Sequence, residues 1–232
     1  MKKVLGLWLI VLLVAGAAHA NTLVTALSLG KGTWAFSATG AQQSNYSNIT
    51  DCKQNKGGLS VGYGLTDKLD AYILYGSATT TNYSQLTPLG VQPFDNLLTN
   101  YGLILKYGLM NDTEGAPVSL SIAGGASPFS AELKNATLGV DQFVRGSQGG
   151  IGVLVSKVFI PFVPYLAYQY MLQNGDTGTK GVETQLSIGS LIAWAKNAGL
   201  FVEYTNHVVI TDGGIGYSMG EISLSLAFNI EK

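Results

Sequence analysis

The chain has 232 residues, of which 47% are hydrophobic and only 12% are charged, and its formal net charge at pH 7 is −1. A water-soluble domain usually carries about a quarter charged residues, so much of this protein's surface need not face water. The near-neutral charge offers no basic surface, which excludes nucleic acid as an expected partner.

The first twenty residues have the three parts of a secretory signal peptide. Met1-Lys2-Lys3 is basic, residues 4–14 are apolar, and the segment ends in Ala18-His19-Ala20, a small-x-small cleavage site. The apolar run is shorter than the roughly 20 residues that a spanning helix needs, which disfavours an uncleaved anchor. We therefore expect residues 1–20 to be removed and residues 21–232 to form one domain.

Residues 151–172 form a second apolar stretch, long enough to cross a bilayer as a helix. Pro161 and Pro164 lie in its middle, where each removes an amide donor and breaks a helix. The valines and isoleucines before them favour extended backbone. We therefore predict two strands joined by a turn at Ile160-Pro161.

From residue 31 onward, apolar residues alternate with small or polar ones, as in a strand whose two faces meet different surroundings. The last segment is the clearest case: Ile222, Leu224, Leu226 and Phe228 share one face, and Glu221, Ser223, Ser225 and Ala227 share the other. The pattern predicts no helix and ten strands, at residues 31–41, 57–66, 68–79, 96–109, 116–126, 145–159, 162–173, 182–194, 199–208 and 216–228.

The connections between these segments alternate strictly between short and long. The long ones are at about 42–56, 80–95, 127–144, 174–181 and 209–215. All short turns then lie at one end of the sheet, an asymmetry typical of outer-membrane barrels with short periplasmic turns. An even strand number also places both termini at that end, which we expect to be periplasmic.

These patterns predict an all-β fold: a single antiparallel up-and-down transmembrane β-barrel of about ten strands, with eight or twelve as alternatives. The segment 127–144 is where a further hairpin could be hidden. Closure pairs the last strand with the first and leaves no edge in lipid. The alternative of a soluble periplasmic β-barrel would need many charged residues on its outer face, whereas the smaller-residue face here is Gly, Ser, Ala and Thr.

Aromatic residues on the predicted outer face fall toward both strand ends, as expected of interfacial belts. Those near the short turns are Trp34, Tyr63, Tyr107, Trp194 and Phe228, and those toward the long loops are Tyr75, Tyr101, Tyr170 and Tyr204.

The signal ending in Ala18-His19-Ala20, the hairpin from Gly62 to Asp70 and the alternating last strand together make the chain similar to bacterial outer-membrane β-barrel proteins. This resemblance implies the Gram-negative cell envelope as location, outer-membrane lipid as surroundings and the barrel-insertion machinery as a partner during assembly. Members of this class usually end on an aromatic residue, whereas Phe228 here is followed by four more residues.

Six charged residues are predicted to point into the lumen. Asp70 and Lys106 would form an ion pair near the short turns, either as a gate or as ordinary charge pairing. Glu183, Glu203 and Glu221 would lie together on three consecutive strands, with Arg145 or Lys180 as partners. Clustered carboxylates can bind cations or select for their passage.

No pattern in the sequence points to catalysis. His207, with Asp212 nearby, is the histidine that remains after signal removal, and we expect it at the base of a loop. The paired acidic residues of the omptin proteases are absent, and one cysteine (Cys52) and one histidine predict no metal or other cofactor.

The sequence therefore predicts a narrow porin or structural surface barrel that is not an enzyme. An adhesin-like barrel that binds a surface ligand through the segments 42–56 and 79–95, which are rich in Asn, Gln, Ser and Thr, is the first alternative. An omptin-like or lipid-modifying membrane enzyme is the second. The transported solute or ligand is not specified.

Overall fold

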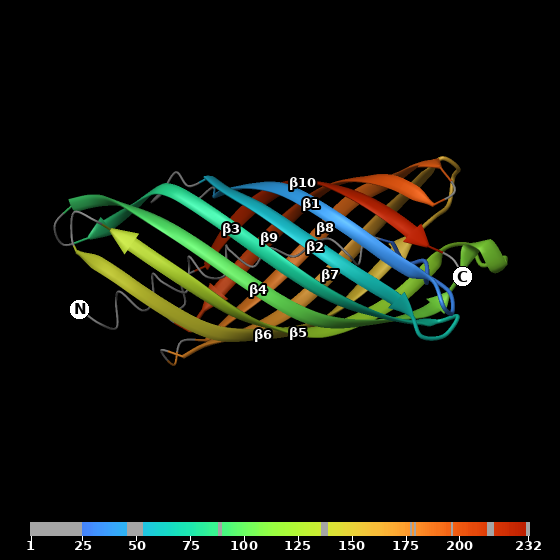
Figure 1. The fold of residues 1–232 in the computed structure, drawn as a ribbon, viewed down its shortest axis with the longest axis horizontal. Coiled ribbons are helices and arrows are strands. Elements are labelled where there is room, and N and C mark those ends of the chain that lie inside the picture. The colour runs from blue at the N-terminus through green and yellow to red at the C-terminus, as the bar shows by residue number, and fades with distance from the viewer. Residues whose placement is uncertain are drawn as a thin grey trace.

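The structure is a computed structural model of the chain, and it describes residues 25–45, 53–87, 90–135, 139–176, 178, 180–195, 197–212 and 216–230. The predicted signal peptide and Cys52 lie outside these residues. Ten antiparallel strands form a closed barrel in which each strand pairs with its neighbours in the chain (Figure 1). The strands are β1 (Trp34–Asn45), β2 (Lys53–Gly64), β3 (Leu69–Thr87), β4 (Gly90–Met110), β5 (Ser119–Asn135), β6 (Val140–Ser156), β7 (Phe162–Gly175), β8 (Lys180–Ala195), β9 (Ala198–Thr211) and β10 (Gly216–Ile230).

The barrel closes through β1 and β10. Their pairing is continuous, from Trp34 opposite Ile230 to Asn45 opposite Met219. The predicted strand number and the predicted pairing of the last strand with the first are therefore confirmed, and the described residues of the segment 127–144 form no further hairpin. Within the described residues, no helix is long and apolar enough to cross a membrane.

The two faces of the sheet differ as the alternation predicts. Large apolar side chains such as Ile73, Ile151 and Ile222 are exposed on the outer face. Ser119 and Ser225 are buried on the inner face. This is the arrangement of a barrel in lipid, because a soluble β-barrel would turn its apolar face inward.

The strands continue well past their predicted ends at the long-loop side. β3 reaches Thr87 and β4 starts at Gly90, so the predicted loop 80–95 is mostly strand. β5 and β6 likewise take up most of 127–144.

In the extended parts of β4, β5 and β6 the alternation is partly reversed, with apolar residues facing inward and charged residues facing outward. For this reason the sequence pattern does not reveal these extensions. Leu98, Ala131 and Val144 are apolar and buried inside, whereas Glu132 and Lys134 lie outside and form an ion pair of 2.7 Å. An outer face that carries charge belongs in water, so strand continues here without the alternation that lipid imposes.

The start of the described chain lies inside the barrel and not in its wall. Residues 31–33, predicted as strand, precede β1, and Ala26 is buried in a cluster with Ala123, Leu154 and Ala167. The carbonyl of Gly30 comes so close to Gly64 that a Cβ at position 64 would overlap it. Residues 25–30 therefore occupy part of the lumen at the short-turn end.

Candidate functional site in the barrel lumen

A continuous line of polar side chains runs across the inner wall from β7 to β2. Glu183 on β8 accepts hydrogen bonds from the amides of Gln173 (2.8 Å) and Gln185 (2.7 Å). Its Oε1 also lies 2.7 Å from Nδ1 of His207 on β9. These side chains are all buried, so this part of the lumen is held together by hydrogen bonds to one carboxylate.

The line continues from His207 to Glu221 on β10 and then to Lys56 on β2. His207 Nε2 lies 3.5 Å from Oε2 of Glu221 on β10, and the same oxygen lies 2.6 Å from Nζ of Lys56 on β2. The lysine reaches across β1, where Ala41 is paired opposite it. A small residue at that place leaves room for the long side chain, so β2 and β10 are joined although they are not neighbours.

Glu203 belongs to a second set of contacts, which lies closer to the short-turn end than the line just described. Its Oε2 accepts a hydrogen bond of 2.7 Å from the Tyr165 hydroxyl on β7, and its Oε1 accepts one of 3.0 Å from Thr205. Tyr165 crosses over Gly189 on β8, where an added Cβ would lie 2.3 Å from the tyrosine oxygen. Glycine at position 189 is therefore what allows Tyr165 to reach Glu203.

The predicted pair Asp70–Lys106 forms at the short-turn end, with 3.3 Å between its charged atoms. Both side chains also bind the backbone of residues 25–29. Lys106 Nζ donates to the Leu27 carbonyl (2.7 Å), and Asp70 accepts from the Leu29 amide (3.1 and 3.2 Å to its two oxygens). The pair therefore fixes the N-terminal segment in the lumen, a role that the sequence did not indicate.

A cavity of about 230 Å³ lies beside this segment. The segment contributes Leu27 and Leu29, the opposite wall contributes Leu191 and Phe201, and Lys106 lies at its margin. Residues 25–30 therefore narrow the short-turn end without filling it.

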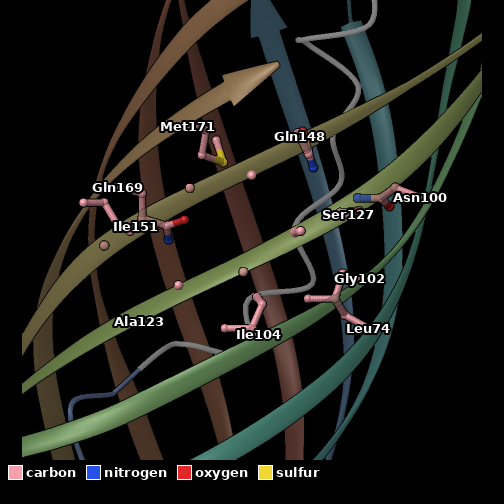
Figure 2. Close-up of a pocket in the computed structure, with 16 residues that line it drawn as sticks. Leu74, Asn100, Gly102, Ile104, Ala123, Ser127, Gln148, Ile151, Gln169 and Met171 are labelled. Atoms are coloured by element: carbon pink, nitrogen blue, oxygen red, sulfur yellow. The ribbon is translucent and has the colours of Figure 1, made fainter. Parts of the chain in front are cut away.

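A second hollow lies in the wall formed by β3 to β7, and Figure 2 shows the side chains around it. It is lined by Leu74, Asn100, Gln148 and Met171 together with glycines of β5 and β6. No charged side chain lines it. Its lining contains side-chain amide groups. The charged side chains of the lumen lie instead in the polar line and in the Asp70–Lys106 pair.

Five of the six predicted lumen charges lie inside the barrel: Asp70, Lys106, Glu183, Glu203 and Glu221. The prediction for Arg145 is wrong. Its side chain is exposed on the outer face, where its guanidinium carbon lies 5.1 Å from the centroid of the Phe143 ring. The inward residues of β6 are even-numbered, such as Val144 and Gln148, so an odd position there faces out.

Two residues of the polar line were missed or misplaced. His207 was expected at a loop base but is buried in the lumen, and Asp212 instead accepts hydrogen bonds from the Lys180 amide. Lys180 itself is exposed. Lys56 was assigned to a loop, although it has the same strand parity as Ser60. His207 lies inside the predicted strand 199–208 with the inward parity of Glu203, and Lys56 directly precedes the predicted strand 57–66, so strict use of the alternation would have found both.

The predicted belt aromatics face outward. Trp34, Tyr107, Trp194, Phe228, Tyr75, Tyr101, Tyr170 and Tyr204 are exposed, and Tyr63 is half-buried against the Trp34 ring, with 4.7 Å between centroids. β3 continues for twelve residues beyond Tyr75, so the barrel extends far past that side of the predicted membrane band. Placement of these residues at the bilayer edges stays a prediction.

The turns at the short-turn end are tied to one another by Asp112. Its carboxylate accepts a hydrogen bond of 2.6 Å from the Ser119 hydroxyl and one of 2.7 Å from the Val158 amide in the β6–β7 connection. Burial alone would raise the pKa of Asp112, but these hydrogen bonds and nearby Lys157 outweigh it and hold the pKa below its usual value. The ionised form therefore supports the contact between the two turns.

Among the described residues, no group of three or more His, Cys, Asp or Glu side chains has the arrangement of a metal site. The three lumen glutamates are instead engaged by Lys56, His207 and hydroxyl or amide donors. These side chains can bind and orient small polar solutes through hydrogen bonds, and the carboxylates attract cations.

No protein-family model and no curated protein matches the chain. Among solved structures, it is similar to the translocator domain of the autotransporter NalP from Neisseria meningitidis, with a TM-score of 0.53, 10% identity, and 87% of this chain and 89% of that chain covered. The transport unit of the autotransporter AIDA-I from Escherichia coli gives 0.50, 13% identity, and coverage of 90% and 94%.

An outer-membrane channel from Pseudomonas putida F1 gives a TM-score of 0.50 at 12% identity, with coverage of 88% of this chain and 97% of that chain. At such low identity the likeness concerns the fold alone. Together with the closed ten-strand barrel and its apolar outer face, it identifies the fold as that of the outer-membrane β-barrels.

Proposed function

We propose that this outer-membrane β-barrel is a narrow, porin-like conduit for small polar solutes, narrowed at rest by residues 25–30 at its short-turn end. The observation that carries the proposal is the buried polar line Gln173, Glu183, His207, Glu221 and Lys56 on the inner wall. Outer-membrane barrels have polar interiors, and hydrogen-bonding and charged groups that line a narrow lumen can bind polar solutes on their way through.

The lumen charges favour cations over anions. Glu183, Glu203 and Glu221 are set against Lys56 and His207 in the same part of the lumen. A barrel of about ten strands is only slightly wider than the eight-stranded size that side chains fill, so conductance should be small. We propose small cations or neutral polar molecules as the solutes, and no catalytic role.

Planar-bilayer recording tests this function. In a potassium chloride gradient we expect small, infrequent openings whose reversal potential indicates cation preference. Replacing the three glutamates by glutamine (E183Q/E203Q/E221Q) should abolish that preference, because the amides keep the shape of the side chains but carry no charge.

The control variant is E114Q, which changes an exposed glutamate outside the lumen and should leave selectivity unchanged. Heat-modifiable gel mobility establishes that each variant is folded. Unchanged selectivity in the folded triple variant would refute the role of the glutamates, and a complete absence of conductance, even after the N-terminal segment is released, would show a structural barrel instead.

A further inference from the structure

The β6–β7 turn differs in chemistry from two other turns at the same end of the barrel. Ile160 at its tip is 90% exposed. On either side of it, Phe159 and Phe162 each expose at least half of their surface. The β2–β3 connection is polar there, with Thr66-Asp67-Lys68, and so is the β4–β5 connection, with Thr113 and Glu114. One sector of the short-turn rim is therefore apolar and uncovered.

Trp194 extends this apolar sector onto the neighbouring strand. The Ala193 amide donates a hydrogen bond of 2.8 Å to the Pro161 carbonyl, which holds the end of β8 beside the turn. The Trp194 side chain is 54% exposed. We call Phe159, Ile160, Phe162 and Trp194 the rim patch.

On β7 and β8 the rim patch continues the lipid-facing surface without a charged residue between them. Directly after β6, Lys157 lies between that surface and Phe159, with its Nζ 3.9 Å from the Asp112 carboxylate. On β7, Phe162 has the same outward parity as Leu166 and Tyr168, and on β8, Trp194 has that of Ile188. The surface that contacts lipid on these two strands thus runs down to the turn itself. Continuity with this surface indicates a bilayer as the occupant of the patch.

Three backbone amides at the turn have partners within the protein. The amides of Phe159 and Phe162 donate to each other's carbonyl oxygens at 2.7 and 2.6 Å, and Pro161 has no amide proton. Just before the turn, the Val158 amide is bonded to Asp112. Because these donors are satisfied within the protein, entry into the bilayer interface does not leave them unpaired.

We propose that the rim patch inserts into the bilayer interface at the short-turn end, while the β2–β3 and β4–β5 turns stay in water. The partner is a phospholipid surface at the boundary between head groups and acyl chains, where aromatic side chains are favoured. The wall formed by β6, β7 and β8 therefore sits deeper in the membrane than the wall formed by β2 and β3, and the barrel axis is tilted. This inference is independent of any conduction through the lumen.

Site-directed fluorescence tests the proposal. Cys52, the single cysteine, is replaced by serine, and I160C or T113C is introduced, labelled with an environment-sensitive dye and reconstituted in phosphatidylethanolamine and phosphatidylglycerol vesicles. We expect the dye at position 160 to emit at shorter wavelength, to be quenched by spin-labelled lipid and to be shielded from iodide. The dye at position 113, on the exposed polar turn, should show the reverse.

F159C provides a second position in the rim patch in case I160C does not fold, which gel mobility reveals. Lipid quenching at either rim position, with iodide quenching at position 113, supports insertion. Iodide quenching at the rim positions as strong as at position 113 overturns the proposal and leaves the patch as an aqueous surface. Lipid quenching at all three positions would also overturn it, because the rim would then lie uniformly in the bilayer.

Discussion

The middle of the lumen and its short-turn end use acidic residues in different ways. In the middle, Glu183, Glu203 and Glu221 accept hydrogen bonds from side chains on other strands, either the adjacent strand or the one beyond it. At the short-turn end, aspartates bind backbone amides of segments outside the sheet: Asp70 binds Leu29 and Asp112 binds Val158.

The difference follows from what each region has to hold. A strand in a closed barrel already has its backbone groups paired, so contacts between strands must come from long side chains such as Glu, Lys and Tyr. A segment outside the sheet has free amides, which a short carboxylate can bind. The mid-lumen contacts therefore join strands of the barrel wall to one another, and the short-turn contacts hold segments that lie outside the sheet.

The largest expected effect comes from removing the anchor of the N-terminal segment. In K106A the carboxylate of Asp70 remains buried without its cation, which should lower the free energy of unfolding by about 3–5 kcal/mol. Urea unfolding in detergent micelles measures the loss, and bilayer recording should reveal more frequent openings once residues 25–30 are released.

The matched control is the double variant D70N/K106M, in which no unpaired charge remains. It should unfold closer to the wild type than K106A does, yet still open more often, because the segment has lost the Lys106 donor and keeps only a neutral amide oxygen at position 70 as acceptor. Equal stability of K106A and wild type would show that the short-turn pair is not an anchor.

A smaller loss of stability is expected from placing a larger residue beside the hydrogen bond between Tyr165 and Glu203. In G189A the new methyl group meets the Tyr165 hydroxyl and also lies 2.6 Å from the Val202 carbonyl oxygen, so the tyrosine must move away from Glu203. Overpacking of this kind costs about 1–3 kcal/mol, again measured by urea unfolding.

G40A serves as control, because nothing lies within 4 Å of a Cβ at that strand position. If Tyr165 holds the wall mainly through Glu203, then Y165F should reproduce part of the G189A loss. A G189A variant as stable as G40A would contradict the contact.

The smallest effect concerns Asp112 and depends on pH. Because its pKa in the folded protein lies below the ordinary value, its stabilisation is present above the unfolded pKa and is lost as pH falls through the folded pKa. We expect D112N to be less stable than the wild type by about 1 kcal/mol near neutral pH.

Unfolding measured across the acid range should show the two proteins converging as Asp112 becomes protonated. E114Q, on the exposed neighbouring position, should remain equal to the wild type at neutral pH. A difference between D112N and wild type that does not shrink in acid would mean that the carboxylate charge is not what ties the two turns together.

Strand number and facing could be predicted from the sequence because lipid and lumen impose opposite demands on alternate residues. Ile222 and Leu224 face out, and Glu221 and Ser223 face in, as the period-two pattern indicates. The same reasoning placed Glu183 and Glu203 in the lumen. It failed for Arg145, which faces outward, and for Lys56, which lies just before the predicted strand. His207 was expected at a loop base although it shares the inward parity of Glu203 within the predicted strand.

The sequence by itself thus determined a barrel of ten strands, its apolar outside and the carboxylates of its interior, since strand parity is a local property. Only the tertiary structure decided that Lys56 reaches Glu221 across β1, that His207 lies between two glutamates, and that residues 25–30 fold back onto Asp70 and Lys106. These contacts depend on barrel closure and on the path of a segment outside the sheet, and no local pattern in the chain encodes either.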